Sequence, residues 1–351
     1  MPNTKKFHPG VFIKDSLESL NMSSKEFSAR SGISERTLSS LINQTGNITF
    51  DIAYNLSKYF GTSINFWTNL QNQFDLYKKE VDEMSTIDYD YKLVKPVIDY
   101  FEKYYAIRKN SSHEEIVNQI RKIVGVNYLS SLERDNLYVS YKSLNHEDKQ
   151  NLFFKNLWIS LALKEARNYP HLTYDQKKFK NSLKDIRNLN LNEPKTFYPK
   201  LKKIFEECGI TLVFLPYLSK TNIYGITKWI TSDHPLIAIS NRNGRADSFW
   251  FTLFHECSHV LMQHRREMLI NDEKNIEDEA NQFACDQLIE KEEWAIFKKT
   301  SQFDEKSILK FSRRNKILPC IVLGRLQKEG LVSYASMTKQ LQVYYDFSFL
   351  V

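Results

Sequence analysis

Two histidines four residues apart, inside an apolar run, constrain the fold of this chain more than any other feature. His255 and His259 flank Glu256 in the pattern H-E-x-x-H. On a helix this spacing places both imidazoles on one face, where they can bind one Zn²⁺, and it directs the intervening carboxylate toward a water molecule beside the metal. The motif is flanked by apolar residues, as expected for a buried active-site helix: Phe251, Phe254, Val260 and Leu261.

A zinc site of this kind needs a third protein ligand and keeps one position open. A second predicted helix follows His259 and begins with the acidic residues 277–279. Glu279 is the predicted third ligand. Glu277 is the alternative, because residues two apart on a helix point to different faces.

The composition is that of a globular protein with two or three domains. The 351 residues are 42% apolar and 26% charged, which excludes a largely disordered chain. No run approaches 18 consecutive apolar residues, and no apolar segment of a signal peptide follows the first charged residues. The four cysteines are too few and too scattered for a disulfide framework or a zinc knuckle. We therefore expect a soluble, cytoplasmic protein with no membrane partner.

The positive charge is concentrated in the middle of the chain. Residues 1–83 are balanced, residues 84–204 carry a net charge of +8, and residues 205–351 carry −1. A basic segment could bind a polyanion such as nucleic acid, or it could simply present solvated, lysine-rich helical faces. The middle segment has helical patterning and no catalytic motif, so we expect a helical linker.

The first quarter of the chain predicts five short helices. Ser23, Ser34 and Thr49 are N-cap residues in front of apolar helical patterns, and Gly32 and Gly61 are typical of helix C-termini. Two short helices joined by the turn at Gly32 form a helix-turn-helix pattern, whose second helix enters the major groove of DNA.

This segment, about residues 7–77, resembles the lambda-repressor-like (Xre) domains and, more closely, the HigA-type antitoxins. The matching stretches include His8-Pro9-Gly10, Ser31-Gly32-Ile33-Ser34, Leu41-Ile42-Asn43 and Phe66-Trp67-Thr68-Asn69-Leu70-Gln71. The resemblance implies binding to an operator-like site on double-stranded DNA. Helix-turn-helix proteins usually bind paired half-sites as dimers, so we expect a homodimer.

The same motif assigns candidate DNA contacts on the second helix. These are the residues expected to face outward: Glu35, Arg36, Ser39, Ser40 and Asn43. Arg36 can form a bidentate contact with guanine. Glu35 repels phosphate and the segment has no net positive charge, so a module kept only for dimerisation or partner binding is the alternative.

Three short strands precede the histidine motif: 210–215, 223–226 and 236–240. Residues from about 205 to 335 resemble the ImmA/IrrE family of zinc metallopeptidases. The matching stretches are Lys228-Trp229, Ile239-Ser240-Asn241-Arg242, Asp247 through His259, Glu279-Ala280-Asn281-Gln282-Phe283-Ala284 and Leu318 through Gln327.

This second resemblance implies a thermolysin-like (gluzincin) site. His255, His259 and Glu279 would bind Zn²⁺, with Glu256 as general base in the hydrolysis of a peptide bond. The protein substrate would be a repressor or an antitoxin-type regulator. The alternative is a HigA-like transcriptional regulator or antitoxin whose peptidase domain is a sensor or is vestigial.

Contacts with the substrate are less constrained by the sequence. The strand 236–240 could pair with an extended substrate, which makes Ser240 and the following Arg242 candidate substrate-binding residues. The group that stabilises the oxyanion stays open among three candidates: His264, Tyr224 and His234.

Together these features predict a mainly helical α+β protein in three parts. Residues 1–83 form a five-helix, lambda-repressor-like domain, and residues 84–204 form the basic helical linker. Residues 205–351 form a gluzincin-like domain with a small sheet and the H-E-x-x-H helix.

Overall fold

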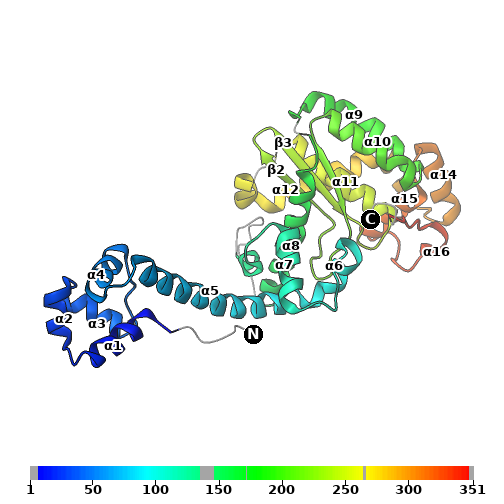
Figure 1. The fold of residues 1–351 in the computed structure, drawn as a ribbon. Helices are drawn as coiled ribbons and strands as arrows, with labels where there is room; N and C mark the ends of the chain where they lie inside the picture. The colour runs from blue at the N-terminus through cyan, green and yellow to red at the C-terminus, as the bar shows by residue number, and fades with distance from the viewer. Residues whose placement is uncertain (1–6, 135–145, 171, 264–265, 348–351) are drawn as a thin grey trace. The chain divides into compact units, whose positions relative to one another are not determined.

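The computed structural model describes residues 7–134, 146–170, 172–263 and 266–347, and these form two compact units, 1–92 and 93–351 (Figure 1). The N-terminal unit contains four short helices and most of a long one: α1 (Pro9–Ser19), α2 (Ser24–Ser31), α3 (Glu35–Ile42), α4 (Phe50–Phe60) and α5 (Ile64–Val94).

The predicted helix boundaries of the N-terminal unit are present as hydrogen-bonded caps. The side chains of Ser23, Ser34 and Thr49 each accept a hydrogen bond from a backbone N–H three residues on. Gly32 and Gly61 end α2 and α4 in the left-handed conformation that glycine adopts without strain. The five predicted helices are present and contribute to one apolar core. The fifth differs from the prediction of a short helix, because α5 is 31 residues long and continues past residue 83 to Val94.

The C-terminal unit begins with helices that surround a three-stranded sheet. The helical elements before the sheet are η1 (Lys95–Val97), α6 (Ile98–Tyr105), α7 (His113–Val124), η2 (Leu129–Glu133), α8 (His146–Ala166), α9 (Gln176–Asn188), η3 (Leu189–Leu191) and α10 (Pro194–Glu207). The helices after it are α11 (Ala246–Leu261), α12 (Arg266–Leu288), α13 (Lys291–Lys299), α14 (Glu305–Asn315), α15 (Pro319–Lys328) and α16 (Thr338–Leu341). Among the described helices, none is long and apolar enough to cross a bilayer.

The sheet has the order β1-β3-β2. Its strands are β1 (Thr211–Leu215), β2 (Gly225–Thr231) and β3 (His234–Ser240). β3 is parallel to β1 and antiparallel to β2. Every residue of β3 is buried, so both faces of the central strand are covered; α8 packs against β1 and β3, and α11 packs against β2 and β3. The small predicted sheet is confirmed, and it supports the motif helix α11.

One aromatic core joins segments that are far apart in the sequence. Phe197 of α10 contacts Phe249 and Trp250 of α11, with ring centroids 5.4 and 5.1 Å apart. The same ring lies 5.3 Å from that of Tyr345, near the end of the described chain. Helices α9 and α10 thus share the core of the sheet and of α11.

Candidate metal centre

The two histidines of the motif meet a carboxylate from the next helix. His255 Nε2 lies 3.1 Å from His259 Nε2, because both project from the same face of α11. Glu277 of α12, which packs along α11, places one carboxylate oxygen 3.2 Å from His255 Nε2 and the other 3.5 Å from His259 Nε2.

This donor set fits a zinc ion. Two imidazole nitrogens and one carboxylate oxygen form the ligand set of many hydrolytic zinc sites. With metal–ligand bonds of about 2.0–2.1 Å, two ligands of a tetrahedral centre lie roughly 3.3 Å apart, and the three observed separations lie close to that value. Three protein ligands would leave a tetrahedral ion one position for water or substrate.

Asn281, one helical turn after Glu277, orients the first histidine. Its side-chain oxygen lies 3.1 Å from His255 Nδ1. An amide oxygen only accepts, so Nδ1 carries the proton and the lone pair of Nε2 faces Glu277. Such outer hydrogen bonds hold metal-binding imidazoles in place.

The structure differs from the sequence expectation for the third carboxylate. Glu279, the favoured residue, is exposed and lies outside the cluster that contains His255, His259 and Glu277. Residues two apart on a helix differ by about 200° in direction, so only one of the two glutamates can face α11. The alternative residue, Glu277, has that position.

Glu256 is buried beneath strand β2. It is 6% exposed, and its Oε2 accepts a hydrogen bond of 2.8 Å from Thr227 Oγ1. Burial raises the pKa of Glu256 to about 7, partly opposed by the nearby His255 and by the Thr227 hydrogen bond. At Gly225, an added Cβ would lie 3.0 Å from Glu256 Cγ and Oε1, so this position keeps the strand close to the carboxylate.

A cavity of about 730 Å³ opens beside His255 and Glu256. Its size is within the usual range for ligand sites. Helix α8 contributes Ile159 to its wall, and α15 contributes Ile321. The helical segment before the sheet therefore forms part of the candidate site.

The three oxyanion candidates have different positions. Tyr224 lines the cavity. His234 does not: it is buried at the start of β3, where Nε2 lies 2.8 Å from Thr211 Oγ1. His264 lies outside the described residues.

The structure contradicts the expected pairing of a substrate with strand 236–240. β3 is the central strand and already pairs with β1 and β2, so neither of its edges can accept another strand. Ser240 is buried and donates its hydroxyl to Ile223 O at 2.6 Å. Arg242 donates to Asn222 O at 2.8 Å and lies over the ring of Tyr224, which holds the loop before β2.

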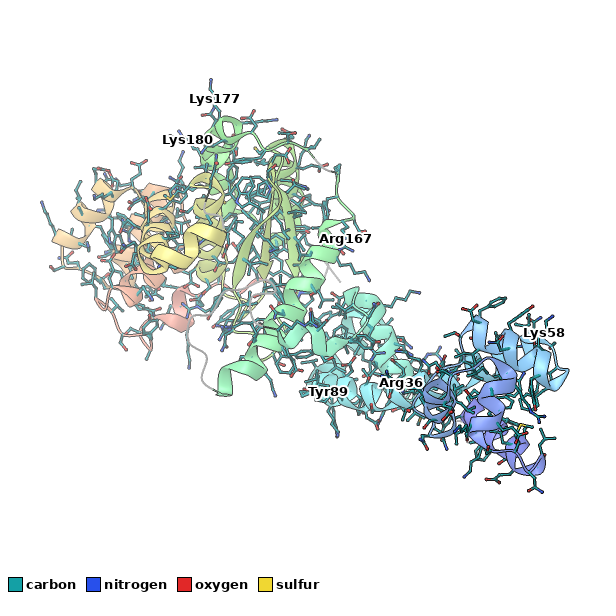
Figure 2. The ribbon with its side chains drawn as sticks, turned by 90° about the vertical axis from the view of Figure 1, so that its left-hand side faces the viewer. Arg36, Lys58, Tyr89, Arg167, Lys177 and Lys180 are labelled. Atoms are coloured by element: carbon teal, nitrogen blue, oxygen red, sulfur yellow. The ribbon has the colours of Figure 1, made fainter. Side chains whose placement is uncertain are left out.

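On the N-terminal unit, α3 presents most of the predicted DNA contacts. Glu35, Arg36, Ser39 and Asn43 are exposed, and Arg36 is labelled in Figure 2. Asn43 Nδ2 donates to Ser39 Oγ at 3.3 Å. Ser40 is half-buried and donates to Thr37 O at 2.7 Å, so it is less available than the other four.

Sequence reasoning missed Thr227, Gly225 and Asn281. Asn281 had a usable signal, because it lies one turn from Glu277 on the predicted helix. Thr227 and Gly225 had none, because only the pairing of β2 in the sheet brings them to Glu256.

Comparison with known proteins finds one family match near the N-terminus and another in the C-terminal unit. Residues 13–67 match the family model described as Helix-turn-helix, and residues 205–326 match the peptidase M78 model, described as IrrE N-terminal-like domain. The chain is 38% identical over 72 residues to the uncharacterized HTH-type transcriptional regulator YddM of Escherichia coli, covering 20% of this chain and 77% of that protein. It is 33% identical over 73 residues to the uncharacterized regulator YbaQ of the same species, covering 20% of this chain and 65% of that protein.

Solved structures are similar to about a quarter of the chain. One is a putative antidote protein of a plasmid maintenance system from Nostoc punctiforme, with 33% identity, a TM-score of 0.23, and coverage of 23% of this chain and 90% of that one. Another is the Pseudomonas aeruginosa antitoxin HigA with the higBA promoter, with 26% identity, a TM-score of 0.23, and coverage of 24% and 95%.

The fold and the family matches define a two-part protein, a helix-turn-helix regulator domain joined to a peptidase-type domain. The chain belongs to the Xre-like helix-turn-helix family through its N-terminal unit, and it carries an ImmA/IrrE-like domain of the peptidase M78 family in its C-terminal unit. Both predicted resemblances are confirmed.

Proposed function

We propose that this protein is a DNA-binding regulator whose C-terminal unit is a zinc-dependent endopeptidase. The observation that carries the proposal is the convergence of His255, His259 and Glu277. His255 also lines the cavity of about 730 Å³, together with the buried Glu256. Its substrate, by the family resemblance, is a repressor or antitoxin-type protein.

Each residue of the centre has a defined part in this proposal. His255, His259 and Glu277 would hold the ion, and Asn281 would fix the ring of His255. When bound, zinc supplies a Lewis acid that polarises the peptide carbonyl and lowers the pKa of water to about 7. Glu256 accepts the proton of the attacking water and returns it to the leaving amine. Thr227 holds that carboxylate toward the cavity.

The edge of the sheet offers a place for the substrate backbone. Within the described residues, β2 has β3 on one side and no strand on the other. β2 begins at Gly225, which lines the cavity and lies against Glu256. An extended peptide added to this edge would place a peptide bond near the carboxylate of Glu256. In this proposal the substrate backbone pairs with β2, and not with the strand 236–240 as the sequence suggested.

We propose operator-like double-stranded DNA as the ligand of the N-terminal unit, bound by a homodimer in the cytoplasm. The exposed residues of α3 support this proposal, as does the match of residues 13–67 to the helix-turn-helix family. Arg36 is the residue of α3 best suited to a base contact, since guanidinium pairs with guanine.

Zinc content tests the metal centre. We expect one zinc per purified chain, retained when exposed Glu279 is changed in Glu279→Ala and lost in Glu277→Ala. Removing a ligand should weaken zinc binding by more than the roughly 10–100-fold typical of an outer hydrogen-bond partner. Elemental analysis after dialysis measures the content. Wild-type protein that takes up no zinc on reconstitution would favour a regulator that uses the peptidase fold as a sensor.

Arg36→Ala tests the DNA interface. We expect a loss of about 1–3 kcal/mol of binding free energy, because one bidentate base contact is removed. Fluorescence anisotropy would measure it on a duplex selected by the wild-type protein from random sequences. Lys58→Ala on α4 is the matched control, since it removes the same charge from an exposed position on another helix. Equal losses in both variants would contradict base recognition by α3.

A further inference from the structure

We propose that the outer face of α9 and α10 binds the phosphate backbone of duplex DNA. This basic face consists of six exposed lysines: Lys177, Lys180, Lys184, Lys195, Lys200 and Lys203. It belongs to the C-terminal unit and is separate from the helix-turn-helix.

The two helices carry a strong local excess of positive charge. Together α9 and α10 contain nine Lys and Arg and three Asp and Glu, a net charge of +6. The whole chain of 351 residues has a net charge of +7. A positive excess of this size on two neighbouring helices produces a local field that attracts polyanions.

Packing forces these lysines onto one side of the helix pair. α9 buries Phe179, Leu183 and Ile186, and α10 buries its own apolar stripe in the same core. The two helices contact each other and lie side by side in Figure 1. In Figure 2 the side chains of Lys177 and Lys180 project away from the domain.

The carboxylates of the helix pair do not neutralise the face. Glu207 pairs with Lys178 at 3.5 Å, and Lys178 is not one of the six lysines. Asp185 and Glu206 form no ion pair with the six within the described part of the chain. On α9, Lys177, Lys180 and Lys184 follow helical spacing, so they form a continuous stripe.

The dimensions of the stripe fit a nucleic-acid backbone. Lys177 and Lys184 are about 10 Å apart along the helix axis, at 1.5 Å per residue. One DNA strand presents a phosphate about every 3.4 Å of helix axis, so the stripe spans about three phosphates. Duplex DNA is favoured over an acidic protein because the same chain carries a helix-turn-helix unit. This choice of partner rests on the proposed function, which is DNA binding by the N-terminal unit.

Salt dependence of binding to a random-sequence 30-base-pair duplex tests the proposal. Each lost phosphate contact lowers the slope of log K against log salt by about 0.9. For the full chain with Lys177→Gln, Lys180→Gln and Lys184→Gln, we expect the slope to fall by about 2–3 and the Kd at 0.1 M KCl to rise at least about fivefold. The matched control is Lys299→Gln, Lys306→Gln and Lys310→Gln, which removes three exposed lysines from α13 and α14 and should leave the slope unchanged.

A second set, Lys195→Gln, Lys200→Gln and Lys203→Gln, tests the α10 side independently. An unchanged slope in both sets, with unchanged folding by circular dichroism, would overturn the proposal and point to an acidic protein as the partner. The result is independent of sequence recognition by α3. A smaller salt slope in the lysine variants, together with unchanged DNA affinity in Arg36→Ala, would support the basic face and reject base recognition by α3. An unchanged slope in the lysine variants, together with weaker binding by Arg36→Ala, would reject the basic face and support base recognition by α3.

Discussion

Glu256→Gln is expected to slow peptide hydrolysis by about 10²–10⁴-fold, the usual contribution of a positioned general base. The substitution keeps the size of the side chain and an oxygen that can accept the Thr227 hydrogen bond, which is 2.8 Å long in the structure. It removes only the ability to accept a proton from water. Zinc content should stay at the wild-type level, because Glu256 is not among the three residues that converge on the metal position.

Cleavage of a mixed peptide library, read by mass spectrometry, measures this effect without knowledge of the natural substrate. Glu279→Gln is the matched control, because it makes the same chemical change at an exposed position outside the cluster. We expect its rate to lie within about twofold of wild type. Wild-type rates in Glu256→Gln would reject Glu256 as the base, whereas no cleavage by the wild-type protein itself would leave the sensor-type regulator as the better description.

The sequence predicted the residues of this centre that lie close together on one helix, but not the residue that comes from a different helix. His255, Glu256 and His259 lie on one helix, so spacing alone placed them on a common face. The third carboxylate comes from another helix, whose rotation about its own axis depends on tertiary packing. The sequence around Glu277 and Glu279 does not show which of the two faces the histidines. The packing of α12 on α11 decides this, and it turns Glu277 inward.

The fold follows the same rule. The caps and apolar spacing of residues 7–77 are local signals, and they predicted the five helices of the N-terminal unit. The strand order was not local: 236–240 reads as an isolated apolar strand, and only long-range pairing makes it central. For the helices of 84–204, amphipathic patterning showed that they are helical but not what their apolar faces contact.

Phe197→Ala is expected to lower the free energy of unfolding of the C-terminal unit by about 3–5 kcal/mol, the usual cost of truncating a buried aromatic side chain. Phe197 is fully buried, and its ring contacts Phe249, Trp250 and Tyr345. The substitution thus opens a cavity where α10, the motif helix α11 and the C-terminal segment meet. If residues 84–204 acted only as a linker, a substitution in α10 would barely affect the unit that holds the metal centre.

Urea unfolding followed by tryptophan fluorescence measures the effect, since Trp250 contacts the substituted ring and four of the five tryptophans lie in the C-terminal unit. Leu191→Ala is the control from the same stretch of chain: its side chain is 55% exposed, so we expect a change within about 0.5 kcal/mol. A small and equal change in both variants would mean that α10 does not stabilise the unit. A large change in Phe197→Ala alone, with zinc lost at lower urea, would show that the helices before the sheet are part of the body that holds His255, His259 and Glu277 together.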